Sequence, residues 1–379
     1  MEINSDKNFI FEPYGVNTVM IAGVKDKSIT RAILPETDER GSLVSAIGGE
    51  VFSGYEKLTE VFIPAAVGFI GDDAFKDCRA LTEVRYGGDV ERWCNIQLGT
   101  MYSNPLFYAH DLYVLAGGEY RSVTRGQLIL PETLKSVCAK AFSGCENLTS
   151  VVIPEGVESI GVGAFCSCEN IISVSFPSTL KKIGAFAFER CFTLSSANIP
   201  ENVTEIGDYA FCDCKELATV SLPAGLKNIG SAAFSDCRRL ENIIIPSGVK
   251  SIGKFAFSEC DNLSVAIIPP EVQTIEEGTF FNCRSLTKVR LPDSVVSVGD
   301  GAFSGCEKLS EINIGKNVGF IGEFAFLGCK ALTSVKLLSG SIRIDENAFC
   351  GCENLVVNVP KGSSINKCVF DDCKQVVYY

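Results

Sequence analysis

The chain has 379 residues, a formal net charge of -12 and a pI near 4.8. This acidic balance argues against a nucleic-acid partner or an anionic membrane surface, because binding to either requires a positively charged protein surface. No run approaches the roughly 18 apolar residues of a membrane helix, and the start, MEINSDKNFIF, lacks the basic and apolar segments of a signal peptide, so we expect neither membrane insertion nor a secretion signal in these residues.

The first 46 residues predict a cap. Residues 9–37 alternate apolar and polar positions around Gly15 and Gly23, which is typical of a β-hairpin. The residues that follow resemble repeats: Ile47, Gly48 and Phe52 begin a pattern that returns 23 residues later. A stack of repeats needs a terminal unit to cover its first open face, so residues 1–46 are predicted to be an N-terminal cap hairpin.

A variant segment, 86–130, interrupts the repeats. DVERWCNIQLG predicts a short helix, SNPLFYA a second helical turn beginning near Asn104 and Pro105, and DLYVLAGGEYRSV a hairpin around Gly117 and Gly118. Its aromatic residues have two interpretations: they pack the stack through a longer repeat, or they form a protruding binding element. Burial is the favoured interpretation because large aromatic side chains stabilise mainly when buried. The aromatic residues kept as secondary binding candidates are Trp93, Tyr102, Phe107 and Tyr108.

Ten regular repeats follow, in which a phenylalanine and a cysteine three residues later recur every 23 residues. Self-similarity at such a period predicts a solenoid of stacked units. The phenylalanines and cysteines are predicted to form buried ladders. The phenylalanines are Phe142, Phe165, Phe188, Phe211, Phe234, Phe257, Phe280, Phe303, Phe326 and Phe349, and the cysteines are Cys145, Cys168, Cys191, Cys214, Cys237, Cys260, Cys283, Cys306, Cys329 and Cys352.

Each repeat divides into two predicted arms. In residues 153–176, Ile160, Ala164, Phe165 and Cys168 lie at helical spacing, which predicts a short helix or 3₁₀ turn facing the core. The second arm, around Val174, alternates and predicts a strand that a proline ends. We therefore predict an α/β repeat solenoid with a stacked parallel sheet on one side and short helical or 3₁₀ arms on the other. The solenoid is predicted over 47–379, with regular repeats over about 131–352 and a C-terminal cap over 353–379.

The pattern LxxVxIPxxVxxIGxxAFxxC resembles the leucine-rich repeat of the BspA-like type, known from bacterial surface proteins and some protist surface proteins. This resemblance implies a right-handed leucine-rich-repeat superhelix, an extracellular or cell-surface location and an adhesion or protein-interaction role. It names no ligand. A cytoplasmic location is the alternative, since no secretion signal is visible.

Catalytic and metal-binding patterns are weak. The single histidine, His110, has no nucleophile motif to serve, so a surface or packing role is favoured. Three C-x-C pairs begin at Cys166, Cys212 and Cys350, but each second member belongs to the cysteine ladder and no two pairs lie in adjacent repeats, so four convergent zinc ligands are not expected. We predict no enzyme activity, no catalytic residues, no metal and no cofactor. Burial predicts that the ladder thiols stay reduced.

The strand positions that face outward carry the binding hypothesis. Most are small and polar, but three neighbouring ones are apolar and are bordered by polar and basic residues. An apolar centre with a polar rim is typical of a protein-binding patch, although β-propensity alone also places Val and Ile in strands. The candidate ligand-binding residues are Asn242, Ile244, Val265, Ile267, Lys288 and Arg290. We therefore predict a monomeric, non-enzymatic scaffold that recognises a protein or glycoconjugate. A structural spacer without a ligand is the alternative, and an enzyme has the lowest weight.

Overall fold

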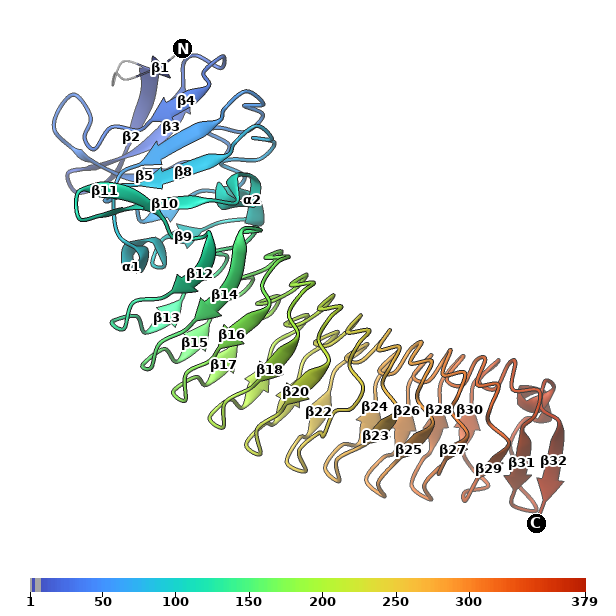
Figure 1. The fold of residues 1–379 in the computed structure, drawn as a ribbon. Coiled ribbons are helices and arrows are strands. Elements are labelled where there is room, and N and C mark those ends of the chain that lie inside the picture. Colours follow the sequence, from blue (N-terminus) through green and yellow to red (C-terminus); the bar gives the residue numbers. More distant parts are fainter. Residues whose placement is uncertain (1, 4–7) are drawn as a thin grey trace. The chain divides into compact units, whose positions relative to one another are not determined.

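The computed structural model describes residues 2–3 and 8–379, which form two compact units, Met1–Pro177 and Ser178–Tyr379. Each unit is a stack of chain turns, here called rungs, that contribute short strands to parallel sheets (Figure 1). The solenoid of stacked units expected from the 23-residue period is thus present in both units. Among the described residues, no helix has the length and apolar character needed to cross a bilayer.

The first unit contains two main sheets. One has the order β1-β4-β6-β8-β10-β11 and the other the order β2-β3-β5-β7-β9. Their strands are β1 (Glu2–Ile3), β4 (Arg31–Ile33), β6 (Glu60–Ile63), β8 (Glu83–Tyr86), β10 (Leu112–Ala116) and β11 (Glu119–Ser122), and β2 (Phe9–Gly15), β3 (Thr18–Val24), β5 (Leu43–Ile47), β7 (Phe69–Ile70) and β9 (Gln97–Leu98). The unit continues with β12 (Gly126–Ile129), β14 (Leu148–Val152) and β16 (Ser173–Ser175), and with β13 (Ser136–Val137) and β15 (Ser159–Ile160).

The hairpin predicted near the start of the chain is confirmed. β2 and β3 pair antiparallel, and β3 then pairs parallel with β5 of the first rung. The hairpin therefore adds two strands to the end of a parallel sheet. The division into a cap over 1–46 and a solenoid over 47–379 stays a prediction.

The elements predicted in the variant segment are also confirmed. Helix α1 (Val90–Trp93) begins after Asp89, whose side chain accepts a hydrogen bond from the backbone N–H of Arg92. The 3₁₀ turn η2 (Met101–Ser103) precedes helix α2 (Leu106–Ala109), and the Asn104 side chain accepts from the N–H of Leu106 at 3.0 Å. β10 and β11 form the expected hairpin, with Gly117 and Gly118 at positive φ.

The second unit repeats one rung design with two strands in most rungs. One set of strands, of two to four residues, contains β18 (Ser196–Asn198), β20 (Thr219–Ser221), β23 (Val265–Ile267), β25 (Lys288–Arg290), β27 (Glu311–Ile312), β29 (Ser334–Lys336), β31 (Val356–Val359) and β32 (Gln375–Tyr378). The other set, of two residues each, contains β17 (Lys182–Ile183), β19 (Glu205–Ile206), β21 (Asn228–Ile229), β22 (Ser251–Ile252), β24 (Thr274–Ile275), β26 (Ser297–Val298), β28 (Phe320–Ile321) and β30 (Arg343–Ile344), and the 3₁₀ turn η3 (Lys367–Phe370) precedes β32.

The α/β description and the predicted helical arms are not confirmed: the fold is a parallel β-solenoid with few helices, and the arms keep only hydrogen bonds of the 3₁₀ type. In the arm of residues 160–168, Ala164 N–H donates to the Gly161 carbonyl at 3.2 Å and Cys168 N–H to the Phe165 carbonyl at 3.2 Å, as in a 3₁₀ turn. Gly163 and Ser167, however, have φ of 62° and 58°. A left-handed residue ends a right-handed helix, so the arm is a series of turns.

A second parallel sheet takes the place of part of each arm. Ile160 belongs to the two-residue strand β15, which pairs in parallel with β13. In the second unit β17, β19, β21 and β22 pair in the same way. Strands of two residues are too short to show an alternating pattern, which is why the periodicity did not reveal them.

The phenylalanine ladder is the centre of the core. From Phe188 to Phe349 in the second unit, successive rings are stacked with centroids 5.1–5.7 Å apart and planes within 1–10° of parallel. The stack ends at Phe370, whose ring is tilted by 40° from that of Phe349. These phenylalanines are almost completely buried. Each buried ring stabilises the fold by about 1.5–3 kcal/mol.

The cysteine ladder links the rungs through hydrogen bonds. The thiol of each cysteine from Cys214 to Cys352 donates to the carbonyl of the phenylalanine in the preceding rung, at 3.0–3.3 Å. All eighteen cysteines lie within residues 8–379 and are thiols rather than disulfides. Burial in apolar surroundings raises the pKa of the ladder thiols, and it raises the pKa of Cys352 to about 12.

Truncating one ring inside the ladder should strongly destabilise the second unit. Phe257 is fully buried between Phe234 and Phe280, so Phe257→Ala should lower the free energy of unfolding by about 3–5 kcal/mol. Phe370→Ala is the control, because its ring has one tilted neighbour at the end of the stack. Urea denaturation followed by circular dichroism measures both. Equal losses for the two variants would contradict the ladder as the main source of stability.

The buried thiols should also make the protein sensitive to alkali. Their folded pKa values lie above the value of about 8.5 for a free cysteine, so the unfolded chain loses thiol protons first as the pH rises. Their contribution to stability is complete below about pH 8 and is lost above it, by up to about 1.4 kcal/mol per pH unit for each thiol. Urea midpoints measured between about pH 8 and pH 10 should fall, and less steeply in Cys260→Ala/Cys283→Ala. Identical slopes in the two proteins would contradict this account.

Candidate functional site

The outward strand positions of the second unit lie in straight columns. β23 and β25 pair in parallel with Val265 opposite Lys288 and Ile267 opposite Arg290. The middle residue of each strand, such as Ala266, is buried, while the residues on either side point outward. Residues 23 apart in the sequence are therefore neighbours on the surface, as the repeat period predicted.

Three apolar side chains meet on this outer face. Ile244 is 85% exposed, Ile267 59% and Val265 38%, and all three belong to adjacent rungs. Together with Asn242, Lys288 and Arg290 they form what we call the isoleucine patch. Exposing isoleucine to this extent gains nothing for the core, so packing does not explain these residues.

The pairing of the outward-facing strands is interrupted at the rung that carries Ile244. β18 and β20 pair over three residues, and so do β23 and β25. Between these two pairs of strands only Asn242 is bridged, to Thr219 on one side and to Val265 on the other. The most exposed apolar side chain of the patch thus lies where the sheet is least regular.

The polar residues that border the patch differ in whether another side chain already pairs with them. Asn242 accepts a hydrogen bond from the hydroxyl of Ser264 at 3.1 Å. Lys288 forms an ion pair of 2.6 Å with Glu311 on the next strand, which offsets its charge. Arg290 is exposed and forms no ion pair with any residue from 8 to 379. The available positive charge beside the isoleucines is therefore that of Arg290.

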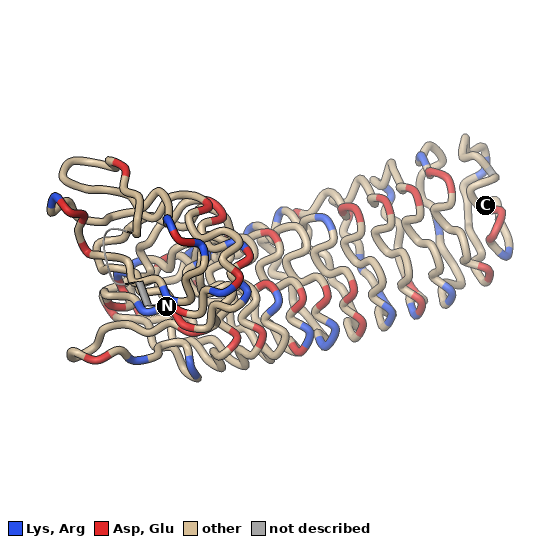
Figure 2. Tube along the Cα trace, turned by 90° about the horizontal axis from the view of Figure 1, so that it is seen from above, with Lys and Arg blue, Asp and Glu red and all other residues tan. Residues whose placement is uncertain are grey.

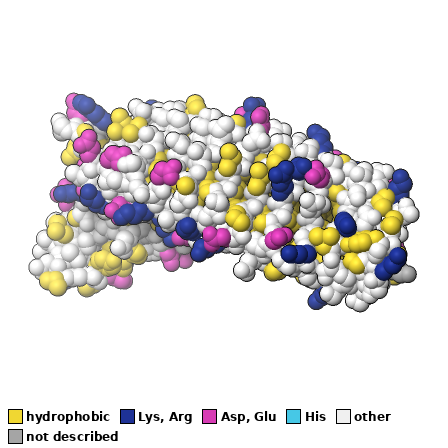
Figure 3. All heavy atoms as spheres, turned by 90° about the horizontal axis from the view of Figure 1, so that it is seen from below, with side chains coloured by type: hydrophobic (Ala, Val, Ile, Leu, Met, Phe, Trp, Pro, Cys, Tyr) yellow, Lys and Arg dark blue, Asp and Glu magenta, His cyan; other side chains and the backbone are white. Residues whose placement is uncertain are grey.

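Hydrophobic and charged residues are mixed along the repeats. Figure 3 shows a face on which hydrophobic side chains gather beside lysine and arginine side chains. Along the repeats, acidic and basic residues are interspersed rather than collected into one field of single sign (Figure 2). Several of them pair between adjacent rungs, as Lys182 does with Glu205 and Lys330 with Glu307. Exposed pairs of this kind contribute little to stability.

The secondary candidates separate into one buried and three half-buried residues. Trp93 is 1% exposed, packs edge-on against Tyr86 and donates from its indole N–H to the Ala141 carbonyl at 2.8 Å. Trp93 is therefore a core residue, as the favoured interpretation expected, and it is no longer a binding candidate. Sequence spacing could not show this burial, because the variant segment has no repeat partner to compare with.

Tyr102, Phe107 and Tyr108 form an interlocked aromatic cluster. Phe107 makes edge-to-face contacts with both tyrosines, at 5.3 Å and 5.1 Å between ring centroids. The Tyr108 hydroxyl accepts a hydrogen bond from the N–H of Asp77 at 3.0 Å. The cluster thus fixes the variant segment to the second rung, while its half-exposed edges keep it a binding candidate.

The groups with catalytic potential serve structural roles. His110 ends α2 in a left-handed conformation, and its Nδ1 lies 2.6 Å from the Gly144 carbonyl and 3.8 Å from Glu146 Oε1. Within the described part of the chain, no group of three histidine, cysteine, aspartate or glutamate side chains is placed to hold a metal ion. The three C-x-C pairs therefore do not meet there.

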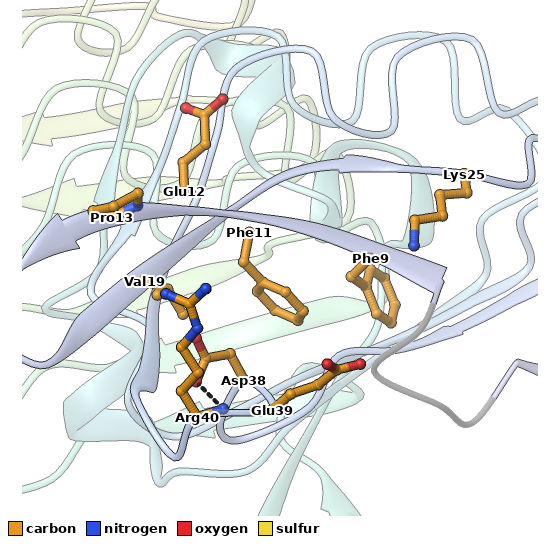
Figure 4. A pocket seen from close by; sticks show the side chains of 9 residues that line it. All are labelled: Phe9, Phe11, Glu12, Pro13, Val19, Lys25, Asp38, Glu39 and Arg40. Atoms are coloured by element: carbon orange, nitrogen blue, oxygen red, sulfur yellow. Dashed lines mark hydrogen bonds between the residues drawn. The ribbon is translucent and has the colours of Figure 1, made fainter.

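A hollow of about 320 Å³ lies beside the N-terminal hairpin (Figure 4). Phe9 and Phe11 of β2 line it, together with the turn that holds Asp38 and Arg40. The backbone N–H of Arg40 donates to the Asp38 side chain at 2.9 Å. The mixture of aromatic, acidic and basic side chains selects no single class of ligand.

Sequence reasoning missed one column of aromatic residues on the turns. Phe186, Tyr209, Phe255 and Phe324 each lie two residues before a ladder phenylalanine. Aligning the repeats at this position would have shown the aromatic residues. It would not have shown that their backbone is left-handed, which comes only from the structure.

These rungs, sheets and ladders define the chain as a leucine-rich-repeat solenoid, and comparisons with known proteins agree. A family model described as the BspA type leucine-rich repeat region, with six copies, matches residues 27–96, 135–264 and 250–377. The chain therefore belongs to the BspA-type leucine-rich repeat family. A search of curated proteins finds no match.

Solved structures of bacterial proteins show the same fold. A leucine-rich repeat protein from Bacteroides ovatus is 28% identical over 100% of this chain and 99% of its own, with a TM-score of 0.64. A leucine-rich cell surface protein from Faecalibacterium prausnitzii is 26% identical over 99% of this chain and 94% of its own, with a TM-score of 0.50. A leucine-rich repeat protein from Eubacterium ventriosum is 20% identical, covers 88% of this chain and 89% of its own, and has a TM-score of 0.60, which shows the fold alone.

The thiols should be almost inert in the folded protein. Cys368 is exposed, whereas Cys138, Cys212, Cys350 and Cys373 are half-buried. Burial raises the pKa of Cys138 and raises those of Cys212 and Cys373 to about 12 and about 11, and a hydrogen bond with Asp372 raises the pKa of Cys350. Because the thiolate is the reactive form, a disulfide reagent near neutral pH should titrate one thiol rapidly and all 18 only in denaturant. Cys368→Ser should remove the rapid reaction. Several rapid thiols in that variant would contradict the buried ladder.

Proposed function

We propose that the protein is a non-enzymatic recognition scaffold at the bacterial cell surface and that the isoleucine patch contacts its ligand. The observation that carries this proposal is the pairing of Ile244 and Ile267, 85% and 59% exposed, on adjacent rungs. Interfaces are built from an apolar centre with a polar rim, and here Arg290 and Asn242 supply part of that rim. The cell-surface location rests on family membership and on the description of the Faecalibacterium relative.

A protein ligand fits the patch better than a glycan does. Ile244, Ile267 and Val265 are aliphatic, so they bury apolar surface without offering an aromatic face on which a sugar ring could stack. Arg290 adds a forked cation that pairs with carboxylates. The expected partner is therefore a protein surface that combines apolar and acidic side chains.

A structural spacer is the second candidate function. The favouring observation is that most outward positions are small and polar, for example Ser196 and Asn198 on β18 and Thr219 and Ser221 on β20. Such a surface offers few anchors for binding. A spacer would need no ligand, and the isoleucine patch would then be an incidental run of residues with high β-propensity.

The test is binding of the purified full chain to an array of host matrix proteins, mucins and bacterial glycans. Ile244→Asp/Ile267→Asp should weaken a protein hit at least about tenfold, because it places two charges in the apolar centre. The matched control is Ser196→Asp/Asn198→Asp, which adds the same charges at the two outward positions of β18, two rungs from Ile244. That control should bind within about twofold of the unchanged protein.

The other outcomes assign the function elsewhere. Binding that survives in Ile244→Asp/Ile267→Asp contradicts the patch and directs attention to Tyr102, Phe107 and Tyr108. A hit confined to glycans contradicts the protein ligand, and no hit at all favours the spacer. Circular dichroism and urea midpoints of each variant verify that the fold is unchanged.

A further inference from the structure

The turns of the second unit carry aromatic residues in a backbone conformation that disfavours them. Phe255 and Phe324 have φ of 56° and 57°, and the two rungs between them carry Gly278 and Gly301 at φ of 58° and 57°. Glycine adopts this left-handed region freely, whereas a bulky residue there is strained by about 1–3 kcal/mol. Phe255 is still 37% exposed and Phe324 38% exposed, so burial offsets this strain only partly.

The two glycines open a slot between the two phenylalanines. The hollow measures about 270 Å³ and is closed at its ends by Phe255 and Phe324. Its inner wall consists of Phe281, Ser304 and Leu327, each one residue after a ladder phenylalanine. The Phe255 ring lies over Gly278, since a Cβ added there would meet the ring at 2.1 Å.

The open part of the slot is above Gly301. A Cβ added at Gly301 would meet nothing nearer than Ser304 Cβ at 3.9 Å and Phe281 Cδ2 at 4.0 Å. The backbone beneath is already paired, because Gly278 N–H donates to the Asp300 carbonyl at 2.9 Å and Gly301 N–H to the Glu323 carbonyl at 2.8 Å. The floor therefore favours an apolar occupant.

The outer rim of the slot is acidic. Glu277, Asp300 and Glu323 occupy the same position in three successive rungs, each three residues before a ladder phenylalanine. Glu277 pairs with Lys254 at 3.1 Å, while Glu323 has no ion pair with any residue from 8 to 379. No basic side chain lines the slot. An occupant is thus favoured when it carries positive charge next to its apolar part.

We propose that this slot is a second binding site, which receives one aromatic or large aliphatic side chain of a partner protein segment that has lysine or arginine on either side. The side chain lies over Gly301 between Phe281 and Leu327, and the flanking cations face Asp300 and Glu323. The hollow is open and smaller than the roughly 300–1,000 Å³ of small-molecule pockets, which suits a peptide side chain.

This site is independent of the isoleucine patch. It lies on the turns that follow the short strands β24, β26 and β28, whereas the patch lies on β23, β25 and the preceding rung. Its charge is also opposite, since carboxylates border the slot and Arg290 borders the patch. Failure of one site leaves the other untouched.

The test uses fluorescein-labelled synthetic pentapeptides and fluorescence anisotropy with the full chain. The probe has a central tryptophan and lysines at both ends, and the comparison peptides carry glutamates at the ends or alanine at the centre. The lysine–tryptophan peptide should bind at least about tenfold more tightly than either, and added salt should weaken it. No binding of this peptide, or equal binding of all three, overturns the proposal.

Gly301→Phe should fill the slot and weaken binding of the lysine–tryptophan peptide at least about tenfold. The change is compatible with the fold, because Phe255 and Phe324 occupy the same column at nearly the same φ. Asn347→Phe is the matched control, because Asn347 has φ of 59° and lies one rung beyond Phe324, outside the slot. The new ring can stack on Phe324 as Tyr209 stacks on Phe186, whose ring centroids are 4.9 Å apart. This control should keep binding within about twofold.

A charge variant gives a second, independent readout. Glu323→Lys should weaken the lysine peptide and strengthen the glutamate peptide, while Ile244→Asp/Ile267→Asp should change neither. Unchanged affinity in both Gly301→Phe and Glu323→Lys overturns the site. A further outcome also overturns the proposal: the protein binds chitotriose but not the lysine–tryptophan peptide, and Gly301→Phe abolishes the chitotriose binding. That outcome assigns the slot to a carbohydrate.

Discussion

The contact between a phenylalanine and the cysteine of the next rung fixes the geometry of the regular repeats in the second unit. In the second unit the Phe211 carbonyl accepts two hydrogen bonds at 3.3 Å, one from the N–H of Cys214 in its own rung and one from the thiol of Cys237 in the next. The ring of the same residue stacks on both neighbours. A rung of different length would lose these contacts together. Where the spacing shortens, between Phe349 and Phe370, the ring tilts by 40° and the stack ends.

A core that is the same in every rung leaves the outward positions free to vary. Neighbouring strands lie about 4.8 Å apart, so every 23rd residue forms a column and four residues of a column span about 14 Å. That length matches a short peptide segment. Both proposed sites are built in this way: Ile244 and Ile267 are neighbours in one column, and Phe255, Gly278, Gly301 and Phe324 are successive residues of another. In both proposals the binding site is set by which residues occupy one column.

The groups of the chain that could react are engaged within the fold. The ladder thiols are buried, and burial raises their pKa, so the thiolate needed for nucleophilic attack is scarce near neutral pH. His110 is used to end a short helix. The two proposed binding sites differ in charge: one lies beside Arg290 and the other beside Asp300 and Glu323. Opposite charge means that the two sites would select different partners, which suits a scaffold that joins them.

The sequence by itself determined which positions in successive repeats are structurally equivalent. Period and spacing located the ladders, the two hairpins, the helical turns of the variant segment and the outward column of Ile244 and Ile267. Only the tertiary structure decided the rest: the arms are turns and a second sheet, Trp93 is buried, and Gly278 and Gly301 open a slot. The reason is physical. A repeat pattern reports which side chains share an environment, whereas a left-handed backbone at Phe255 or a ring lying over Gly278 depends on contacts with the next rung, which no single repeat contains.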